Sequence, residues 1–300
     1  MSDLRSYRGR LAPSPTGYLH LGHARTFWIA YERARANQGV LVLRNEDLDP
    51  RRSKAEYVQA FLEDLRWFGI AWQEGPDIGG LYAPYSQSER REFYLHAWQK
   101  LYDGGWIYPC TCSRKDLAEA AQAPHETTPE RASTARWRGF GSQESGDEPM
   151  YSGKCRTWKL QADHPAGVNW RFRVPDGRVI RFTDGAQGEQ QYTAGTDFGD
   201  FIVWRRDDVP AYQLAVVADD DAMRITEVVR GCDLLKSTAR QILLCEALGI
   251  APPAYYHCDL LLDASGTRLA KRADALSLRA LRARDMKPEE LRARIMTCKT

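Results

Sequence analysis

The spacing of apolar and polar residues predicts a β-α-β unit at the start of the chain. A short strand is expected over 7–11 and an amphipathic helix over 22–36. The loop 12–17 between them contains two prolines and cannot be helical. Gly39 ends the helix, and the continuous apolar run 40–43 is typical of a parallel strand that is buried on both faces.

Capping signals and further apolar runs predict the elements that follow. Ser53–Glu56 and Ser86–Glu89 have the capping-box pattern that opens a helix, and we expect these helices to extend to about Phe68 and Tyr102. The later elements expected are strands at 201–204 and 214–217, a helix at 237–248 and a helical tail from 278 onward.

The middle of the chain differs in composition. Residues 118–150 are rich in small and polar residues and poor in large apolar ones, which predicts a mobile insertion. Beyond it, 169–174 and 179–182 alternate at period two around the turn 175–178, and this pattern predicts a β-hairpin.

Composition narrows the class of protein. The chain has 300 residues, of which 43% are hydrophobic, so it can bury a sizeable core and wholesale disorder is excluded. No run approaches the ~20 apolar residues of a membrane helix, and the polar N-terminus does not resemble a signal peptide. A net charge of +2 argues neither for nor against a polyanionic partner. We therefore expect a cytoplasmic protein, a monomer with no membrane partner.

Two short segments have the residue types of a phosphate site. His20 and His23 flank Gly22 where the first loop meets the first helix, and a helix N-terminus attracts anions. Near the other end of the chain, Lys271 lies in the basic stretch Arg268–Arg272, from which a lysine could reach a polyphosphate. Taken alone, the histidines could be structural or bind zinc, and the basic stretch could simply be solvated.

Together these segments resemble a known family. Arg10–Arg25 closely resembles the ATP-site signature of class I aminoacyl-tRNA synthetases, and specifically the glutamyl branch, whose signature begins R-[FL]-A-P-S-P-T-G. Arg268–Arg272 resembles the second signature of that class, K-M-S-K-S, in a degenerate form that retains Lys271 but has Ala270 and Arg272 where the family has small polar residues. The resemblance continues through 43–49, 211–220 and 227–231, and covers most of 7–275 except the insertion.

The length of the chain refines the resemblance. Only about 28 residues follow Arg272, whereas synthetases that read the anticodon while charging the tRNA 3′ end continue into a large additional domain. The chain is therefore similar to the glutamyl-Q tRNA(Asp) synthetase family, which activates glutamate and attaches it to queuosine in the anticodon loop of tRNA(Asp). The alternatives are a truncated glutamyl-tRNA synthetase paralogue that charges a tRNA 3′ end, and a non-catalytic relative that binds ATP or RNA.

The resemblance implies a glutamate pocket whose side chains match the charges of glutamate. Glutamate carries two carboxylates and one ammonium, so its pocket needs guanidinium groups and a carboxylate. By resemblance, Glu46 binds the ammonium, Arg10 and Arg230 bind the carboxylates, and Tyr212 provides a hydrogen bond. The remaining implied glutamate-binding residues are Leu11, Ala12, Pro13 and Ser14. Each residue taken singly could instead belong to an ordinary ion pair or to the core.

The resemblance also implies the ATP site and its chemistry. The implied ATP-binding residues are His20, Gly22, His23 and Lys271, and the two histidines and Lys271 are the implied catalytic residues. ATP would bind as its magnesium complex and react with L-glutamate to give glutamyl-adenylate, so alignment and charge stabilisation carry the reaction.

A zinc site is predicted at a cysteine cluster. Cys110, Cys112 and Cys155 supply three thiolates, and one further donor would complete a tetrahedral structural site. Members of the resembled family combine Cys-x-Cys with Tyr-x-x-x-Cys, which implies Tyr151 as the fourth ligand, and His125 in the insertion is the alternative. A buried structural cysteine pair is the other interpretation of this cluster.

The complete prediction is an α/β fold with a doubly wound, Rossmann-type parallel sheet. The catalytic domain comprises 1–105 and 196–275, an inserted zinc-binding and acceptor subdomain comprises 106–195, and a helical extension comprises 276–300. The expected RNA partner is the anticodon stem-loop of tRNA(Asp). The tail contains a basic cluster that could contact RNA phosphates or form a solvated helix face: Arg279, Arg282, Arg284, Lys287, Arg292, Arg294 and Lys299.

Overall fold

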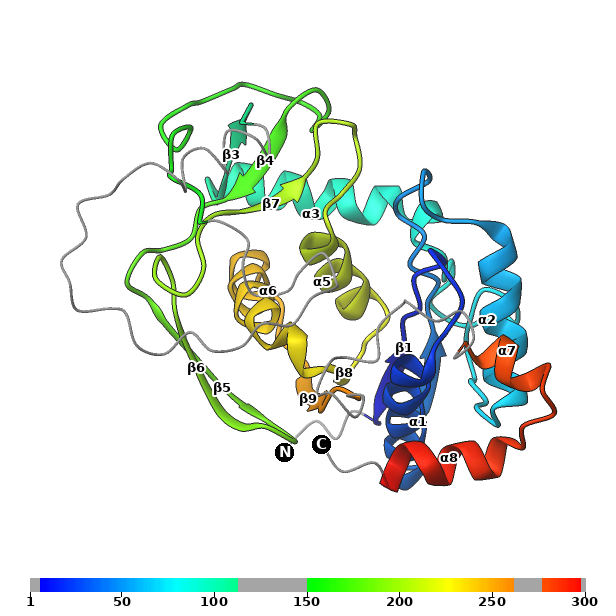
Figure 1. Ribbon diagram of the computed structural model, residues 1–300. Coiled ribbons are helices and arrows are strands. Elements are labelled where there is room, and N and C mark those ends of the chain that lie inside the picture. The colour runs from blue at the N-terminus through cyan, green and yellow to red at the C-terminus, as the bar shows by residue number, and fades with distance from the viewer. Residues whose placement is uncertain (1–5, 113–149, 262–276, 298–300) are drawn as a thin grey trace.

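The protein is built around a parallel sheet at the N-terminal β-α-β unit. The computed structural model describes residues 6–112, 150–261 and 277–297 (Figure 1). The four strands of the parallel sheet are β1 (Arg8–Leu11), β2 (Val40–Leu43), β8 (Glu227–Gly231) and β9 (Ala254–Cys258). Pairing is parallel between β1 and β2 and between β8 and β9. The Thr226 amide donates to the Arg8 carbonyl oxygen at 2.9 Å, which places β8 beside β1. This arrangement confirms the predicted α/β class.

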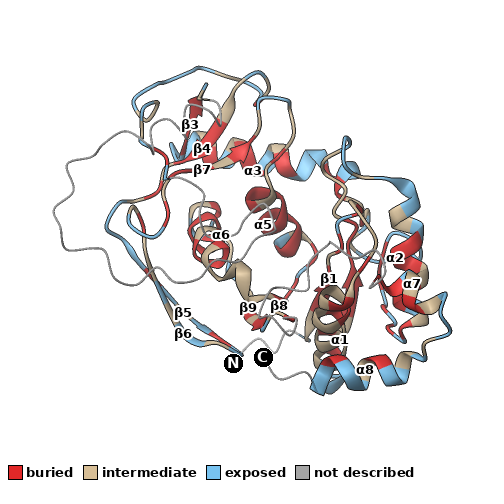
Figure 2. Ribbon diagram, viewed as in Figure 1, coloured by how far each residue is buried: buried red, intermediate tan, exposed pale blue. Residues whose placement is uncertain are grey.

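Helices cover this sheet and divide the core into two clusters. The helices are α1 (Leu21–Ala36), α2 (Ala55–Trp67), α3 (Arg91–Asp103), α5 (Tyr212–Ala222), α6 (Leu235–Leu248), α7 (Leu278–Arg282) and α8 (Pro288–Thr297). One large apolar cluster packs α1, α2, α7 and α8 against residues of all four strands, including Val229 and Cys258. The other packs α3, α5 and α6 against residues of β2, β8 and β9, including Val42 and Val228. Figure 2 shows that buried residues are prominent in α5 and α6.

Two further β structures are present: a separate three-stranded sheet, and a two-stranded ribbon that joins the parallel sheet. The antiparallel strands β3 (Ile107–Cys110), β4 (Asn169–Phe172) and β7 (Phe201–Trp204) form a three-stranded sheet in that order. Strands β5 (Val179–Asp184) and β6 (Gly188–Thr193) form an antiparallel ribbon, and β5 joins β9 in parallel where Asp184 lies opposite Tyr255. In Figure 1 this ribbon runs beside α6 and away from the three-stranded sheet.

The predicted hairpin between 169–174 and 179–182 is wrong, although both segments are strands. A turn exists, since the Arg178 amide donates to the Pro175 carbonyl oxygen at 3.1 Å, but β4 then pairs with β3 and β7 while β5 pairs with β6. The hairpin turn lies one strand later, where Asp184 Oδ1 accepts the amides of Ala186 and Gln187 at 3.0 and 2.9 Å. Alternation predicted the strands correctly but could not identify their partners.

The predicted strand at 214–217 is also wrong, because this segment lies inside helix α5. Its apolar run is continuous because the helix is buried on nearly all sides, so it lacks the helical periodicity of a surface helix. Strands β3, β6, β8 and β9 were not predicted from patterning. Strands β1, β2 and β7 and helices α1 and α6 confirm the predictions for their segments, and α6 ends at Gly249, whose φ is +67°.

Both predicted helices with capping boxes exist, but the boxes do not form. Helix α2 begins after Lys54 with no side-chain cap, and the segment after Ser86 is a short 3₁₀ turn (Gln87–Glu89) that precedes α3, which ends at Gly104. The tail is helical as expected. No helix in the described ranges has the length and apolar character needed to span a membrane. The predicted insertion 118–150 lies almost entirely outside the described residues, as does His125.

Candidate active site

The two histidines of the first signature cap helix α1. His20 is the N-cap residue: its Nδ1 accepts the Gly22 amide at 3.1 Å, and its own amide donates to His23 Nδ1 at 3.3 Å. The two rings stack with centroids 3.8 Å apart. Because both Nδ1 atoms accept hydrogen bonds, each neutral imidazole carries its proton on Nε2 and presents a donor there. A pair of such donors at a helix N-terminus suits a phosphate group.

The second signature, with Lys271, lies outside the described residues, but the chain after it returns to the first signature. Ser277 forms a β-bridge with His20, and the Leu278 amide donates to the Leu19 carbonyl oxygen at 2.7 Å. Ser277, the first described residue after the second signature, therefore lies directly beside His20. Ser277 follows Lys271 by only six positions, which is compatible with the predicted nucleotide site shared by the two signatures.

A buried charge cluster lies where β1 and β2 end. Arg44, which directly follows β2, is fully buried; its Nη1 lies 2.6 Å from Asp220 Oδ1 and its Nη2 lies 2.9 Å from Glu46 Oε1. Arg10 on β1 lies against the same aspartate, with its Nε 3.6 Å from Asp220 Oδ1, and its Nη1 donates to the Val229 carbonyl oxygen at 2.9 Å. The structure thus brings the predicted residues Arg10 and Glu46 together through Arg44 and Asp220.

The first loop packs against the same cluster. The Arg44 amide donates to the Leu11 carbonyl oxygen at 2.8 Å, and the Glu46 amide donates to the Pro13 carbonyl oxygen at 3.0 Å. Leu11 and Pro13 are buried, whereas Ala12 is half-buried and Ser14 is exposed. The loop backbone therefore positions Glu46, and Ser14 remains accessible at the edge of the site.

Burial and crowding shape the electrostatics of this cluster. Desolvation lowers the pKa of Arg10, and the charges of Arg44 and Arg230 lower it further while Asp220 opposes them. Desolvation likewise raises the pKa of Glu46, in spite of the nearby guanidinium groups. Burial alone would lower the pKa of Arg44, but the surrounding carboxylates raise it well above its ordinary value. An incoming anion beside Arg10 and an incoming cation beside Glu46 would each relieve a desolvation cost.

Arg230 and Tyr212 form the other side of the site. Arg230 is at the carboxyl end of β8 and Tyr212 is the first residue of α5, and Arg230 Nη1 lies 3.5 Å from the Tyr212 hydroxyl. Arg230 also donates from Nε to His257 Nε2 at 3.1 Å and from Nη2 to Thr238 Oγ1 at 2.7 Å. The carboxyl ends of parallel strands are where ligands bind in open α/β sheets.

Several residues of this neighbourhood were missed by the sequence analysis. Arg44 and Asp220 both lie in segments that carried the family resemblance, and a charged residue beside a buried apolar run was an available signal. His257 lies on β9, a strand that was not predicted, and its contacts are with residues distant in sequence. No local pattern identifies such a residue.

The structure brings the four predicted zinc ligands together at the end of β3. The Sγ atoms of Cys110, Cys112 and Cys155 all lie within 4.8 Å of one another. The Tyr151 hydroxyl lies 3.5 Å from Cys110 Sγ and 3.7 Å from Cys112 Sγ. Ligands about 2.3 Å from a tetrahedral zinc lie roughly 3.8 Å from one another, so this donor set fits zinc.

A buried arginine lies against this cysteine cluster. Arg171 on β4 is 2% exposed, donates from Nε to Cys110 Sγ at 3.3 Å, and lies over the Tyr151 ring at 4.1 Å from its centroid. A guanidinium in this position stabilises thiolate and phenolate charge.

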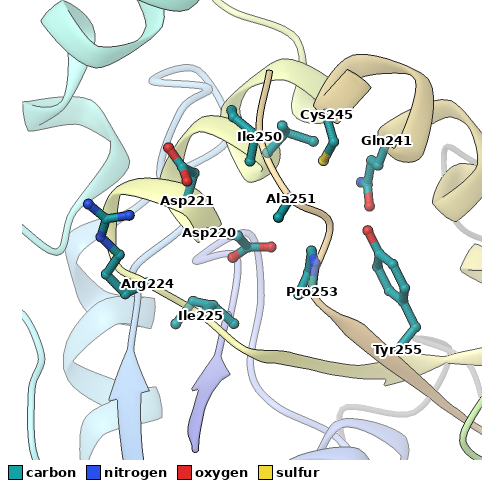
Figure 3. Close-up of a pocket in the computed structure, with 11 residues that line it drawn as sticks. Asp220, Asp221, Arg224, Ile225, Gln241, Cys245, Ile250, Ala251, Pro253 and Tyr255 are labelled. Carbon is teal, nitrogen blue, oxygen red and sulfur yellow. The ribbon is translucent and has the colours of Figure 1, made fainter. Parts of the chain in front are cut away.

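A small pocket adjoins the charge cluster and shares Asp220 with it. Its volume is about 30 Å³, and Figure 3 shows Asp220, Asp221, Arg224, Gln241, Cys245 and Tyr255 among its lining residues. The residues that line it precede β8 and β9 or begin them, so it lies at the amino ends of these strands. A cavity of this size holds one or two water molecules and not a nucleotide.

The C-terminal basic cluster is partly occupied by contacts within the protein. Arg282 pairs with Glu63 at 3.2 Å, and Arg292 donates to the Phe68 carbonyl oxygen at 2.5 Å and lies over the Trp28 ring. These two arginines hold α7 and α8 against the body of the protein, so a solvated helix face does not describe them, and the contact of the cluster with RNA phosphates stays a prediction. Lys299 lies outside the described residues.

Comparisons with known proteins agree with this geometry. A family model described as "tRNA synthetases class I (E and Q), catalytic domain" matches residues 6–298. A glutamyl-Q tRNA(Asp) synthetase of Nitratidesulfovibrio vulgaris is 47% identical over 284 residues, which are 92% of this chain and 81% of that protein. Glutamate–tRNA ligase 2 of Acidithiobacillus ferrooxidans is 45% identical over 280 residues, covering 92% of this chain and 54% of the ligase.

A solved structure has the same fold. It is a glutamate tRNA ligase of Elizabethkingia meningosepticum in complex with its amino acid, with a TM-score of 0.74, 29% identity and coverage of 90% of this chain. This chain spans 53% of that ligase, about half of its length.

Proposed function

Because this chain belongs to the family of class I tRNA synthetases of the glutamyl and glutaminyl group, a family of ligases, we propose that it activates glutamate with ATP and transfers it to queuosine in the anticodon loop of tRNA(Asp). The main support is the 47% identity to a glutamyl-Q tRNA(Asp) synthetase, which extends over 81% of that relative. The charge cluster at the strand ends supports glutamate as the activated amino acid.

The first step would be the attack of the glutamate α-carboxylate on the α-phosphorus of ATP. A P–O bond forms to the carboxylate oxygen and the bond to the pyrophosphate oxygen breaks. Magnesium bound to ATP would screen the charge of the polyphosphate. His20 and His23 would donate from Nε2 to the phosphates at the helix N-terminus, and Lys271 would add a positive charge.

The glutamate would lie between Arg10 and Glu46 on one side of the site and Arg230 on the other. Arg10 and Arg230 are placed to bind carboxylates, and Glu46 is placed to bind the ammonium while Arg44 holds one of its oxygens. The raised pKa of Glu46 and the lowered pKa of Arg10 are consistent with a site whose charges are completed by a zwitterionic ligand. In the second step the acceptor nucleoside attacks the acyl carbon and AMP leaves.

The cysteine cluster would hold one structural zinc ion. We propose Cys110, Cys112, Cys155 and Tyr151 as its ligands, with His125 as the alternative to Tyr151. This site would stabilise the start of the inserted subdomain, 106–195, and it takes no part in the chemistry.

The acceptor can be tested with two RNA substrates. Labelled glutamate should appear on an isolated queuosine-containing anticodon stem-loop of tRNA(Asp), and the same stem-loop with guanosine should remain unlabelled. Pyrophosphate exchange should proceed with ATP, Mg²⁺ and glutamate alone. If labelling occurs only on a whole tRNA with an intact terminal adenosine, and occurs with or without queuosine, the protein is a ligase that charges the tRNA 3′ end. No exchange under any condition would establish a non-catalytic relative.

A further inference from the structure

Arg230 donates a hydrogen bond to a buried imidazole, which in turn contacts a buried carboxylate. His257 Nε2 accepts from Arg230 Nε at 3.1 Å, and His257 Nδ1 lies 2.5 Å from Asp184 Oδ2. The three residues come from three adjacent elements, β8, β9 and β5. His257 is 0% exposed, Asp184 2% and Arg230 5%, so the chain of hydrogen bonds is sealed from solvent.

The donors and acceptors allow only one tautomer of His257. Asp184 accepts the backbone amides of Ala186, Gln187 and His257, and hydrogen bonds from these amides and from the His257 ring lower its pKa even though burial alone would raise it. The carboxylate is therefore ionised and only accepts, so Nδ1 must carry the proton. A guanidinium only donates, so Nε2 must offer its lone pair to Arg230.

A charged imidazole is excluded at this position. Burial, together with the charge of Arg230, lowers the pKa of His257 to about 4, although Asp184 opposes both effects. The groups that face the ring are Asp184 from β5, Arg230 from β8, Thr238 from α6 and Tyr255 from its own strand, whose ring is 6.1 Å away. Arg10 on β1 adds a second positive charge. His257 is consequently neutral throughout the pH range of an enzyme assay.

We propose that His257, held by Asp184, is a positioning residue that sets the orientation of the substrate-binding guanidinium of Arg230. The Nε–H of Arg230 is used by His257 and one Nη2–H by Thr238, so the guanidinium plane is fixed from two sides. Its Nη1 remains on the side of Tyr212, where the proposed glutamate carboxylate would bind. This inference rests on the proposed function, since it assigns Arg230 to a glutamate carboxylate.

Three substitutions separate a positioning role of His257 from a packing role. His257→Leu removes both hydrogen bonds, whereas His257→Gln keeps an acceptor near Nε2. Asp184→Asn keeps Oδ1 for the turn amides but presents an N–H to His257 Nδ1, so the ring must move its proton to Nε2 and turn a donor toward Arg230. The exposed His96 on α3 provides a matched control, His96→Leu.

Pyrophosphate exchange then measures the effect on each substrate. His257→Leu and Asp184→Asn should raise KM for glutamate by about 10- to 100-fold, the loss expected for one hydrogen bond to a charged group. KM for ATP should stay within about twofold, His257→Gln should recover most of the glutamate affinity, and His96→Leu should match the parent. Glutamate KM within about twofold of the parent in both variants, or a fall in kcat and melting temperature without a KM effect, would overturn the proposal.

Nitrogen NMR of the ring tests the same hydrogen bonds without relying on activity. The parent should show His257 as the Nδ1–H tautomer from pH 6 to 8, and Asp184→Asn should invert it. If His257 of the parent is doubly protonated, or is neutral with its proton on Nε2, the proposed positioning role is wrong. This conclusion does not depend on which amino acid the enzyme activates. A parent that shows the Nδ1–H tautomer but does not exchange pyrophosphate with glutamate refutes the proposed substrate instead.

Discussion

Replacing Arg44 with leucine removes the only guanidinium that directly joins Glu46 to Asp220 among the described residues. Arg44 has no exposed surface, its Nη1 lies 2.6 Å from Asp220, and its Nε lies 3.8 Å from Asp219. The substitution leaves Asp220 and Glu46 without their nearest counter-charge, whereas Asp219 keeps Arg90 at 2.6 Å. Breaking a buried ion pair by removing one partner costs about 3–5 kcal/mol, so we expect a loss of this size in the free energy of unfolding and a fall of roughly 6–15 °C in melting temperature.

The dependence on pH provides a second signature of Arg44→Leu. Desolvation already raises the pKa of Glu46 in the parent, and losing Arg44 raises it further. A carboxyl group whose pKa is higher in the folded than in the unfolded state binds more protons when folded, so stability falls as pH rises. The deficit of the variant should therefore be largest above pH 7 and shrink toward pH 5.

Urea unfolding followed by circular dichroism measures both effects. The matched control is Arg35→Leu, because Arg35 is 63% exposed and pairs with an exposed glutamate at 3.0 Å; this change should stay within about 0.5 kcal/mol. Adding Asp220→Asn to Arg44→Leu should recover part of the loss by removing an orphaned charge. A loss below about 1 kcal/mol, or an equal loss at pH 5 and pH 8, would refute this account of the cluster.

Three further outcomes are expected. Lys271→Ala should slow adenylate formation by about 10²-fold while leaving glutamate binding unchanged, because the role proposed for this lysine is to stabilise charge on the phosphates. Pyrophosphate exchange measures the first effect and equilibrium binding of glutamate measures the second. Cys110→Ser should release the zinc ion measured by elemental analysis and lower the melting temperature, whereas Cys232→Ser, outside the cluster, should retain it. Burial raises the pKa of Asp64 to about 6, and its side chain is fully buried. The folded state thus loses stability as pH rises through 6, so Asp64→Asn should stabilise the protein by about 1–2 kcal/mol at pH 8 and by little at pH 4.

Each of these outcomes has a result that contradicts it. Exchange by Lys271→Ala within a few fold of the parent would make Lys271 an ordinary solvated charge. Parent protein purified without chelator and found to lack zinc would remove the metal from the cysteine cluster. A denaturation curve for Asp64→Asn that is less stable than the parent at pH 8 would show that the contact between Asp64 and Arg282, at 3.4 Å, outweighs the burial of its charge.

The parts of the fold that sequence patterns predicted are those whose cause is local. Strand β1, helix α1 and strand β2 follow from a proline-containing loop, a helical stripe and a glycine stop, all within about 35 residues. The segment 214–217 was misread because burial on nearly all sides of α5 extends even to Gln213, Asp219 and Asp220, which leaves no polar face to mark a helix.

The residues of the candidate site also divide into those that a local sequence motif predicts and those that it does not. The sequence analysis predicted four of the candidate site residues because each lies in a motif whose residue order carries the resemblance: Arg10, Glu46, Tyr212 and Arg230. The support of Arg230 by His257 and Asp184 was not predictable, since the latter two are separated by 73 positions and meet only because β5 joins β9. A pairing at this distance is specified by the whole sheet and leaves no trace in the residues next to either partner.

The charges of the site also link substrate binding to the assembly of the sheet. Arg10 and Arg44 lie before the segment 113–149, and Asp220 and Arg230 lie after it, yet the members of each group are buried against the other. The guanidiniums of the first half do not have all their partners within that half, because Arg10 and Arg44 both contact Asp220 and Arg10 Nη1 donates to the β8 carbonyl of Val229. Burying such charges is favourable only when both halves are in place. The electrostatic arrangement proposed to recognise glutamate is therefore the same one that joins β1 and β2 to β8 and α5, and a substitution that weakens the pocket's charges should also weaken the union of the two halves.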